Sequence, residues 1–311
     1  MRETALITGV SGFCAGHLAR RLRAQGGVRL LGTDISEHPP GGGLIDGYRR
    51  ADVAVYDEMK EAVRWASPQW VFHLAGQTTG PPQTQYRTNL LGTINLLEAI
   101  REYATDARVL LVGSAAEYGP VEASQMPVSE EHPCRPTGAN GLSKYAVTLA
   151  GLDYASRLGL KVIIARPFNI VGAGVPSSLI VGAVLARTKR ALSGEGEPVI
   201  KVGRLDCQRD FVAVQDAVEL YIRMVNGERW GEVFNVCSGR PTLIQDLVAE
   251  ILCHSPRQVR VEFDSGLARP SDVDVSFGRW AKANQAFGYE PVTPLEEAIR
   301  EAWMHEMEGG S

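Results

Sequence analysis

The sequence predicts an α/β fold, in which a parallel sheet is covered by helices on both faces and is followed by a smaller lobe. Strand-like and helix-like segments alternate through the first two-thirds of the chain. The strand-like segments are continuously apolar, which is typical of parallel strands buried on both faces. Beyond about residue 172 the alternation loosens, and this indicates a second unit of different build.

The expected elements of the sheet follow one another along the chain. Strands are expected at residues 5–8, 28–32, 51–55, 70–74, 108–113 and 161–166. Helices are expected after the glycines that follow the first strand, with Leu18 and Leu22 on one face, and at residues 57–66, 89–103 and 141–158. The glycine- and proline-rich stretch at residues 37–43 is typical of a loop.

The rest of the chain mixes helices with short strands. Helices are expected near residues 178–193, 215–226 and 243–254, and strands near 198–202, 232–236 and 258–263. We therefore divide the chain into residues 1–172 and residues 173–311. The smaller lobe is expected to fold over the carboxyl ends of the sheet strands. The boundary is not sharp, because helices and strands of the second part could pack within the first domain.

The composition is that of a soluble globular protein with a sizeable core. The 311 residues are 44% hydrophobic and 22% charged, with a net charge of −4. This mild acidity gives no reason to expect nucleic acid or an anionic membrane as a partner. No apolar run approaches the length that spans a bilayer, and the chain enters a strand-like run at once, so no signal peptide is expected.

The cysteines point to a reducing compartment. All five are widely scattered and none forms a metal-ligand spacing, so neither disulfides nor a metal site are expected. They are best read as buried thiols in a cytoplasmic protein.

A glycine turn between the first strand and the first helix predicts a dinucleotide site. Glycines in this position let the chain turn tightly and let backbone N–H groups approach a pyrophosphate at the helix N-terminus. The spacing alone is weak evidence, but its place in a strand–turn–helix unit strengthens it. The expected cofactor residues of the turn are Gly9, Gly12, Phe13 and Ala15, the last being a tolerated variant of the third glycine.

Asp34, at the end of the second strand, favours NAD over NADP. A carboxylate there can accept hydrogen bonds from the ribose hydroxyls of the adenosine. No arginine follows at once to meet a 2′-phosphate. NAD is therefore the expected cofactor, with NADP as the alternative.

The stretch PTGANGLSKYAV, residues 136–147, contains half of a catalytic pair. Lys144 sits where many nicotinamide enzymes keep a lysine one helical turn after a catalytic tyrosine, but the residue four positions earlier is Asn140. A carboxamide has no proton to give at neutral pH; it can hydrogen-bond a carbonyl or hold a water.

Several motifs together resemble the extended short-chain dehydrogenase/reductases that modify nucleotide sugars. These are TGVSGFCAG, FHLAGQT, RTNLLGTINLLEAI, GSAAEYGP, NGLSK and RPFNIVGAG. Within that superfamily, IKVGRLDCQRDFVAVQDAVELY, GEVFNVCSG and LARPSDVDV most resemble the GDP-4-keto-6-deoxy-mannose reductases. The similarity runs from Met1 to about Tyr289. It implies a Rossmann-type domain, a nicotinamide cofactor, a GDP-sugar pocket under the C-terminal lobe, and a homodimer formed through helices 89–103 and 141–158.

The resemblance also implies roles for single residues. Cofactor contacts fall on Asp52, Val53, Leu74, Ala75, Gly76, Asn89, Lys144 and Pro167. Substrate contacts fall on Thr78, Asn169, Arg209 and Arg269, of which the two arginines would hold the diphosphate with bidentate hydrogen bonds. Ser114 would hydrogen-bond the reacting carbonyl.

Four departures from the family pattern bear on the reaction. Asn140 replaces the tyrosine that exchanges a proton with the sugar oxygen. Ala115 and Ala116 stand where 4,6-dehydratases carry an acid–base pair, so dehydratase activity is disfavoured. The loop at residues 76–89 is short and proline-rich, and Arg204 replaces an asparagine, which weakens the GDP assignment.

Three sources could replace the lost proton. Tyr145 is turned about 100° away from Lys144 on the helix. Tyr118 is the better candidate, although a structural role at its turn is favoured; a water held by Asn140 and Ser114 is the third. The sequence thus predicts a nucleotide-sugar reductase with an atypical catalytic set. The alternatives are a cofactor-binding paralogue without turnover, acting as scaffold or regulatory subunit, and, more weakly, a nucleotide-sugar epimerase.

Overall fold

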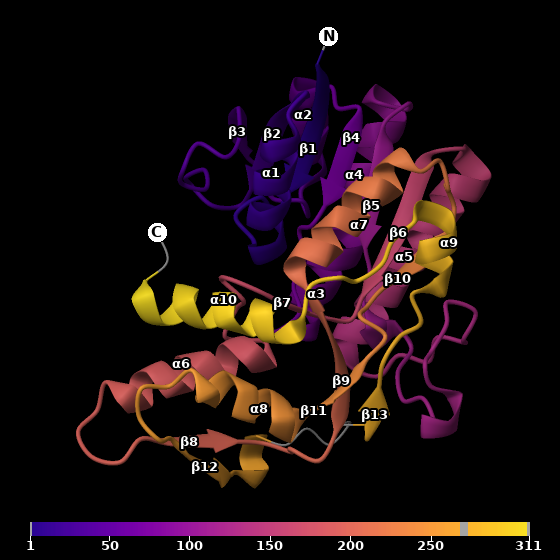
Figure 1. Cartoon of the computed structure of the whole chain (residues 1–311). Helices are drawn as coiled ribbons and strands as arrows, with labels where there is room; N and C mark the ends of the chain where they lie inside the picture. The colour runs from indigo at the N-terminus through magenta and orange to yellow at the C-terminus, as the bar shows by residue number, and fades with distance from the viewer. Residues whose placement is uncertain (1, 268–272, 310–311) are drawn as a thin grey trace.

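The computed structural model describes residues 2–267 and 273–309, and it confirms the α/β class with a seven-stranded parallel sheet and a smaller lobe (Figure 1). The strands of the sheet are β1 (Glu3–Thr8), β2 (Val28–Asp34), β3 (Gly47–Arg50), β4 (Trp70–His73), β5 (Arg108–Val112), β6 (Lys161–Pro167) and β10 (Val233–Val236). Their spatial order is β10-β6-β5-β4-β1-β2-β3. All neighbouring pairs are parallel, as in a doubly wound nucleotide-binding fold.

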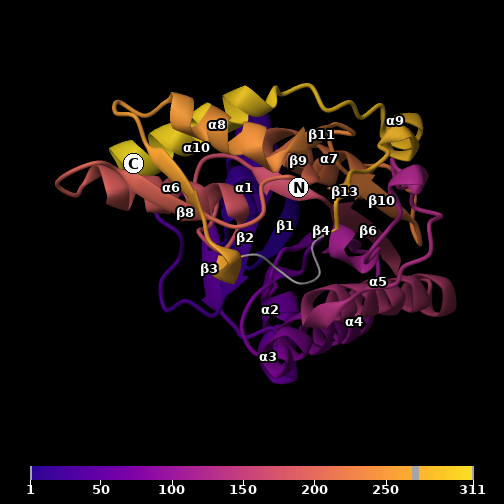
Figure 2. The same ribbon diagram turned by 90° about the horizontal axis from the view of Figure 1, so that it is seen from below.

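Successive side chains of each strand enter two separate apolar cores. Ala5 and Ile7 face a core shared with α1 (Phe13–Gln25) and α7 (Val214–Asn226). Leu6 faces the other side, where it packs with α2 (Tyr56–Ala66), α4 (Gly92–Tyr103) and α5 (Gly138–Leu158). Figure 2 shows this second helical layer on one side of the sheet. Burial on both faces explains why the strands lack polar alternation.

Two expected elements of this domain begin elsewhere in the structure. The third strand was expected at residues 51–55 but lies at Gly47–Arg50. Ala51 and Val53 are buried just beyond its end, so their apolar character reflects a packed loop. The helix expected from residue 89 begins earlier, at α3 (Pro82–Tyr86), and continues through a π-helical turn at Arg87–Leu91 into α4.

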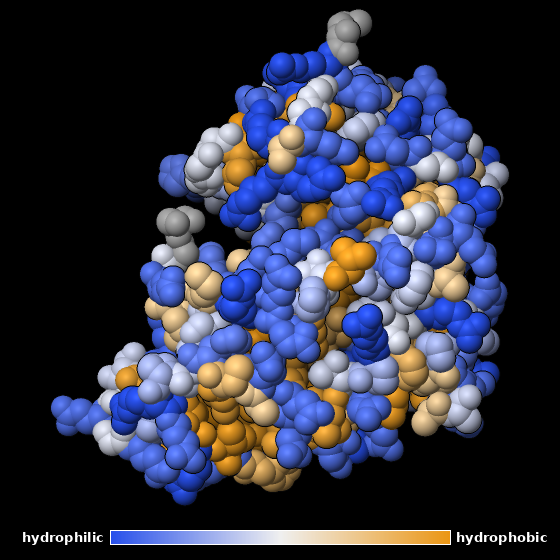
Figure 3. Space-filling model, in the orientation of Figure 1, coloured by the Kyte–Doolittle hydropathy of each residue, from blue (hydrophilic) through white to orange (hydrophobic). Residues whose placement is uncertain are grey.

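The smaller lobe has its own sheets and core. Its four-stranded sheet consists of β7 (Asn169–Val171), β9 (Gln208–Ala213), β11 (Pro241–Leu243) and β13 (Val275–Ser276), and β8 (Val199–Val202) pairs with β12 (Arg260–Phe263). The helices α6 (Ile180–Leu192), α8 (Ile244–Cys253) and α10 (Leu295–Glu308) pack together in a third apolar core. In Figure 3, apolar side chains gather low in the view, over β8 and α8.

Among the described residues from 169 onward, six strands and α-helices were not expected from the sequence. They are β7, β9, β11, β13, α10 and α9 (Ala281–Phe287). Two others, β10 and α7, belong to the large sheet and to one of its helical layers. The division at residues 172 and 173 stays a prediction. Within the described ranges, no helix combines the length and the apolar character needed to cross a bilayer.

Candidate active site

The glycine turn brings β1, α1 and the end of β4 into close contact. Gly9 has φ 66°, and a Cβ on it would lie 2.7 Å from Cα of Ala75, which a real side chain cannot tolerate. Gly12 caps α1 without a side-chain hydrogen bond. The first-turn N–H groups of α1 are therefore open to an anion such as a pyrophosphate, and the residues fit a bound dinucleotide.

Asp34 lies at the other side of this turn. Its carboxylate accepts hydrogen bonds from the backbone N–H of Ser11 at 3.1 Å and of Ser36 at 3.2 Å. Arg50 is the neighbour of Asp34 on β3, but its guanidinium pairs with Glu37 at 3.1 Å. The position suits ribose hydroxyls, and the adjacent arginine is already engaged.

The remaining cofactor candidates line the carboxyl edge of the sheet. Leu74 donates its N–H to the carbonyl of Thr8 at 3.2 Å, which brings the segment after β4 against β1. Val53 is buried, and its carbonyl accepts from the side chain of Asn95 at 3.0 Å. Asp52 pairs with Arg87 at 3.4 Å. This edge therefore brings together the end of β1 and the segments that follow β3 and β4.

His73, which was not predicted as a site residue, links β1 to α4 at this edge of the sheet. Its Nδ1 lies 2.8 Å from Thr8 Oγ1 and its Nε2 lies 3.1 Å from Thr93 Oγ1. Because Thr93 donates to the carbonyl of Asn89, its oxygen must accept from Nε2–H, which fixes the neutral tautomer. Burial lowers the pKa of His73 to about 3, so the ring stays neutral. A histidine ending a continuously apolar strand was the available signal.

Asn89 holds the loop after β4 rather than facing solvent. It is buried in the π-helical turn, and its side chain exchanges two hydrogen bonds with the backbone of Gln77, at 2.7 and 2.9 Å. It also donates to Ser143 Oγ at 2.9 Å. The expected supporting role is therefore a role in positioning: Asn89 ties the loop to α5.

Lys144 reaches the carboxyl end of β5 from α5. Its ammonium donates to the carbonyl of Val112 at 2.8 Å, and the residue is buried. A Cβ at Gly76 would lie 3.1 Å from Lys144 Nζ, so the ammonium directly underlies the loop that follows β4. Burial lowers the pKa of Lys144 to about 8, although the carboxylate of Glu117 opposes this shift.

Ser114 follows the strand end that Lys144 contacts, and Asn140 lies on the same helix as Lys144. Ser114 follows β5 by two residues and caps a 3₁₀ turn at Ala115–Glu117, where its Oγ accepts from the N–H of Ala116 at 3.1 Å. Its hydroxyl proton remains able to bond a carbonyl. Asn140 lies one turn before Lys144 on α5, and no donor among the described residues reaches its buried Oδ1.

Glu117 and Tyr118 belong to a buried network behind the site. Glu117 pairs with Arg166 at 2.9 Å and accepts from Thr148 at 2.8 Å. Tyr118 is 2% exposed, its ring lies against the Arg166 guanidinium, and its hydroxyl donates to Asn235 Oδ1 at 2.7 Å. Burial also raises the pKa of Tyr118. This geometry gives Tyr118 a structural role and argues against it as the catalytic proton donor.

Two of the expected substrate residues line one cavity in the smaller lobe. Asn169 and Arg209 belong to the wall of a cavity of about 540 Å³ formed by α6, α8 and β8. Asn169 donates to the carbonyl of Asp210 at 2.8 Å, which anchors it to β9. Arg204 lines the same cavity and pairs with Asp206 and Asp274. The cavity wall thus combines guanidinium groups with apolar side chains.

Four other candidates have different surroundings. Thr78 is exposed in the loop after β4, and Pro167 is buried at the end of β6. Phe13 packs against both the α1–α7 core and the core of the smaller lobe, and Ala15 is buried in the first turn of α1. Arg269 lies outside the described residues.

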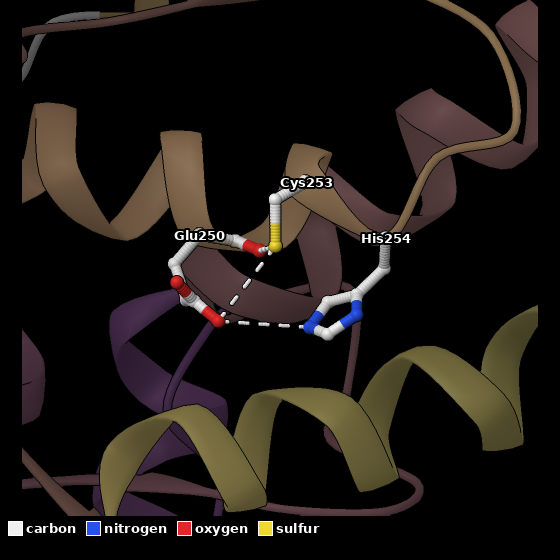
Figure 4. Close-up of side chains that lie close together, drawn as sticks. All are labelled: Glu250, Cys253 and His254. Carbon is white, nitrogen blue, oxygen red and sulfur yellow. Dashed lines mark hydrogen bonds and ion pairs between the residues drawn. The ribbon is translucent and has the colours of Figure 1, made fainter.

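One group of side chains has donors that a metal could use. Glu250, Cys253 and His254 lie within 4.8 Å of one another at the end of α8, and Figure 4 shows them pointing toward a common space. The helical spacing accounts for this: Glu250 pairs with His254 at 3.6 Å, and Cys253 donates to the Glu250 carbonyl at 3.0 Å. None of the three lines the cavity. The expectation of a metal-free site stays a prediction.

Known proteins resemble this chain along most of its length. A protein-family model described as the NAD dependent epimerase/dehydratase family matches residues 5–237. The GDP-6-deoxy-D-mannose reductase of Pseudomonas aeruginosa is 29% identical over 306 residues, covering 96% of each chain. The structure of RMD from Pseudomonas aeruginosa complexed with NADPH has a TM-score of 0.86 at 28% identity, covering 99% of each chain. The UDP-glucose 4-epimerase of Thermus thermophilus in complex with NAD shares the fold, with a TM-score of 0.86 at 24% identity, covering 97% of this chain and 98% of that one.

Proposed function

Since this chain belongs to the NAD dependent epimerase/dehydratase family, we propose that it is a nucleotide-sugar reductase. Its substrate is GDP-4-keto-6-deoxy-mannose or a related nucleotide-linked 4-keto-6-deoxy sugar, which it reduces at C4 with a nicotinamide cofactor. The similarity to a GDP-6-deoxy-D-mannose reductase along nearly the whole of both chains supports this choice of substrate.

One observation carries the proposal: a single chain combines a dinucleotide turn with a cavity that holds Asn169 and Arg209. The turn at Gly9 and Gly12 suits a pyrophosphate. The cavity, of about 540 Å³, is large enough for a nucleotide base and sugar. A guanidinium in its wall suits a diphosphate, which offers paired oxygen acceptors.

The bound cofactor would supply hydride to the carbonyl carbon. Ser114 Oγ–H would hydrogen-bond the carbonyl oxygen and stabilise the negative charge that develops there. Lys144 would hold the nicotinamide ribose hydroxyls from beneath Gly76. Asn89 would keep the loop after β4 in place through its bonds to Gln77. We propose NAD as the preferred cofactor, because Asp34 would repel a 2′-phosphate.

A second reading, of a different class, rests on Asn140. Without a proton donor at this position the chain could bind the cofactor without redox turnover, as a scaffold or regulatory subunit of an active relative. An epimerase is the weaker alternative, since that chemistry needs the same acid–base group. The reductase is preferred because Asn169 and Arg209 share one cavity, which a non-catalytic scaffold has no need to retain.

The test is reduction of freshly prepared GDP-4-keto-6-deoxy-mannose by NADH or NADPH, followed by loss of nicotinamide absorbance. We expect turnover by the wild-type protein. The substitution Asn140→Tyr separates the two readings: a large gain over a wild-type rate near zero would favour the non-redox paralogue. No absorbance loss by a protein that binds the cofactor would overturn the reductase for this substrate.

We further propose a cytoplasmic homodimer that pairs α4 and α5 of two copies. Leu142 and Leu149 are 45% and 50% exposed on α5, and Leu91 is 44% exposed just before α4. Exposed leucines at helical spacing on neighbouring helices support such a contact. The mass of the purified protein in solution tests it.

A further inference from the structure

We propose that Lys144 supplies the proton that the substrate oxygen needs, through a water molecule held by Asn140, while Ser114 hydrogen-bonds the same substrate oxygen. This inference rests on the proposed reductase function. Lys144 would then carry out the proton transfer that a tyrosine at position 140 would perform, in addition to holding the cofactor.

The surroundings of Lys144 favour loss of its proton. The side chain is buried, and its ammonium donates to a neutral acceptor, the Val112 carbonyl. Two titratable groups face it: His73 on β4 and Glu117 after β5. His73 is neutral. The charge of Glu117 is already shared with Arg166 at 2.9 Å, so the ammonium is weakly compensated. The lowered pKa of Lys144, about 8, agrees with this geometry.

The side-chain oxygen of Asn140 is suited to bind a water molecule. Asn140 Oδ1 is buried, and among the described residues no donor reaches it. Leaving a buried acceptor unsatisfied is unfavourable, so a water that donates to it is favoured. Asn140 lies four residues before Lys144, which places both side chains on one face of α5. Ser114 lies two residues past Val112, the hydrogen-bond acceptor of Lys144.

The proton transfer balances without an added reactant. As hydride reaches the carbonyl carbon, the C=O π bond becomes a lone pair on oxygen. The water gives one proton to that oxygen and takes one from Lys144, whose N–H bond breaks and leaves its electron pair on Nζ. Asn140 Oδ1 accepts a hydrogen bond from the other hydrogen of the water and keeps it oriented. Solvent reprotonates the amine after the product leaves.

The first experiment measures the titration of Lys144 in the cofactor-free protein. Lysine labelled with ¹³C at Cε is incorporated, and the Lys144 signal is assigned by its absence in Lys144→Arg. We expect a midpoint near pH 8. A midpoint near 10.4, the ordinary lysine value, would overturn the inference. This readout does not depend on turnover.

The second experiment measures single-turnover reduction with the keto sugar as a function of pH. The wild-type rate should fall as pH rises past about 8, where Lys144 loses its proton. Lys144→Arg keeps the positive charge, but the arginine side chain does not give up its proton. The rate of this variant should therefore be about 10²–10⁴-fold lower than that of the wild type. The double variant Lys144→Arg, Asn140→Tyr should recover part of the lost rate, because the tyrosine hydroxyl can donate the proton.

The outcomes distinguish the proton role of Lys144 from the proposed reductase function. Wild-type turnover with a Lys144→Arg rate within about fivefold contradicts the proton role alone. No wild-type turnover, in a protein that binds the cofactor, contradicts the proposed function. If Lys144→Arg loses cofactor binding, the proton role is tested by the titration midpoint and the wild-type pH profile instead. A midpoint near 10.4, or a rate that does not fall above about pH 8, would contradict it.

Discussion

The Lys144 ammonium donates a hydrogen bond to the Val112 carbonyl oxygen at 2.8 Å, and so joins α5 to the end of β5. This contact places a buried cation at the carboxyl edge of the sheet, where open α/β sheets bind their ligands. Because the partner is a neutral carbonyl, burial of this charge lowers the stability of the cofactor-free protein. Stability measurements can therefore report on the site without any substrate.

Replacing this lysine should stabilise the cofactor-free protein. The folded pKa of Lys144 is about 8 against 10.5 for an ordinary lysine, so the unfolded chain binds more protons between these values. The wild-type protein therefore gains stability as pH rises through that window. Lys144→Met should raise the free energy of unfolding at pH 7 by about 1–3 kcal/mol, and the gain should shrink toward pH 10.5. Urea unfolding at several pH values measures it.

The exposed Lys201 provides the control for this prediction. Lys201→Met should change stability by less than about 0.5 kcal/mol at every pH. A Lys144→Met protein that is less stable than the wild type at pH 7 would contradict the unfavourable burial of this charge.

The glycine turn should distinguish cofactor binding from general stability. Gly9→Ala forces a Cβ to within 2.7 Å of Ala75, so the turn must open and the cofactor Kd should rise at least about tenfold. Gly26 also has a positive φ, 71°, but has no atom near its Cβ position. Gly26→Ala should cost about 1 kcal/mol of stability and leave the Kd unchanged. Calorimetric titration with NADH and NADPH measures the Kd of each variant. Equal Kd values for the two variants would contradict this role of the turn.

Removing one partner of the Glu117–Arg166 pair should strongly destabilise the protein. Both side chains are almost completely buried, so Glu117→Gln leaves an uncompensated guanidinium and should cost about 3–5 kcal/mol. Glu61, which pairs with Arg64 on the surface of α2, is the matched control; Glu61→Gln should cost less than about 1 kcal/mol. Chemical denaturation measures both. A loss below about 1 kcal/mol for Glu117→Gln would show that the pair is not needed.

Asp34 should set the choice between the two nicotinamide cofactors. Its carboxylate spans the turn through Ser11 and Ser36, where a 2′-phosphate would meet like charge. Asp34→Asn should lower the Kd for NADPH relative to that for NADH by about tenfold. Fluorescence titration with both cofactors measures the ratio. A wild-type protein that binds NADPH more tightly, with a ratio unmoved by this substitution, would contradict the assignment of NAD.

Local turn chemistry explains which parts of the site could be predicted from the sequence. Gly9 and Asp34 were predicted because each lies at the end of a strand, in a short segment whose residue types indicate its chemistry. Lys144 was predicted from its position in a motif on one helix. In each case the signal lies within one short segment, although the contacts of these residues are with distant parts of the chain.

The residues that were missed have partners far away along the chain. His73 bonds Thr8, 65 residues before it, and Thr93, 20 residues after it. Nothing in a single sequence marks such a pairing. The third strand was placed on Ala51 and Val53 because their burial after β3 gives the same apolar signal as a strand. Strand β9 was missed because it mixes Arg209 and Asp210 with apolar residues.

Transfer of deuterium from cofactor to sugar would show whether this protein reduces the keto sugar. The protein is incubated with the keto sugar and NADH or NADPH that carries deuterium at both C4 positions of the nicotinamide, and the nucleotide-sugar product is analysed by mass spectrometry and NMR. A reductase predicts a product with one deuterium at C4 of the sugar. Cofactor binding without deuterium in the sugar would contradict the proposed function.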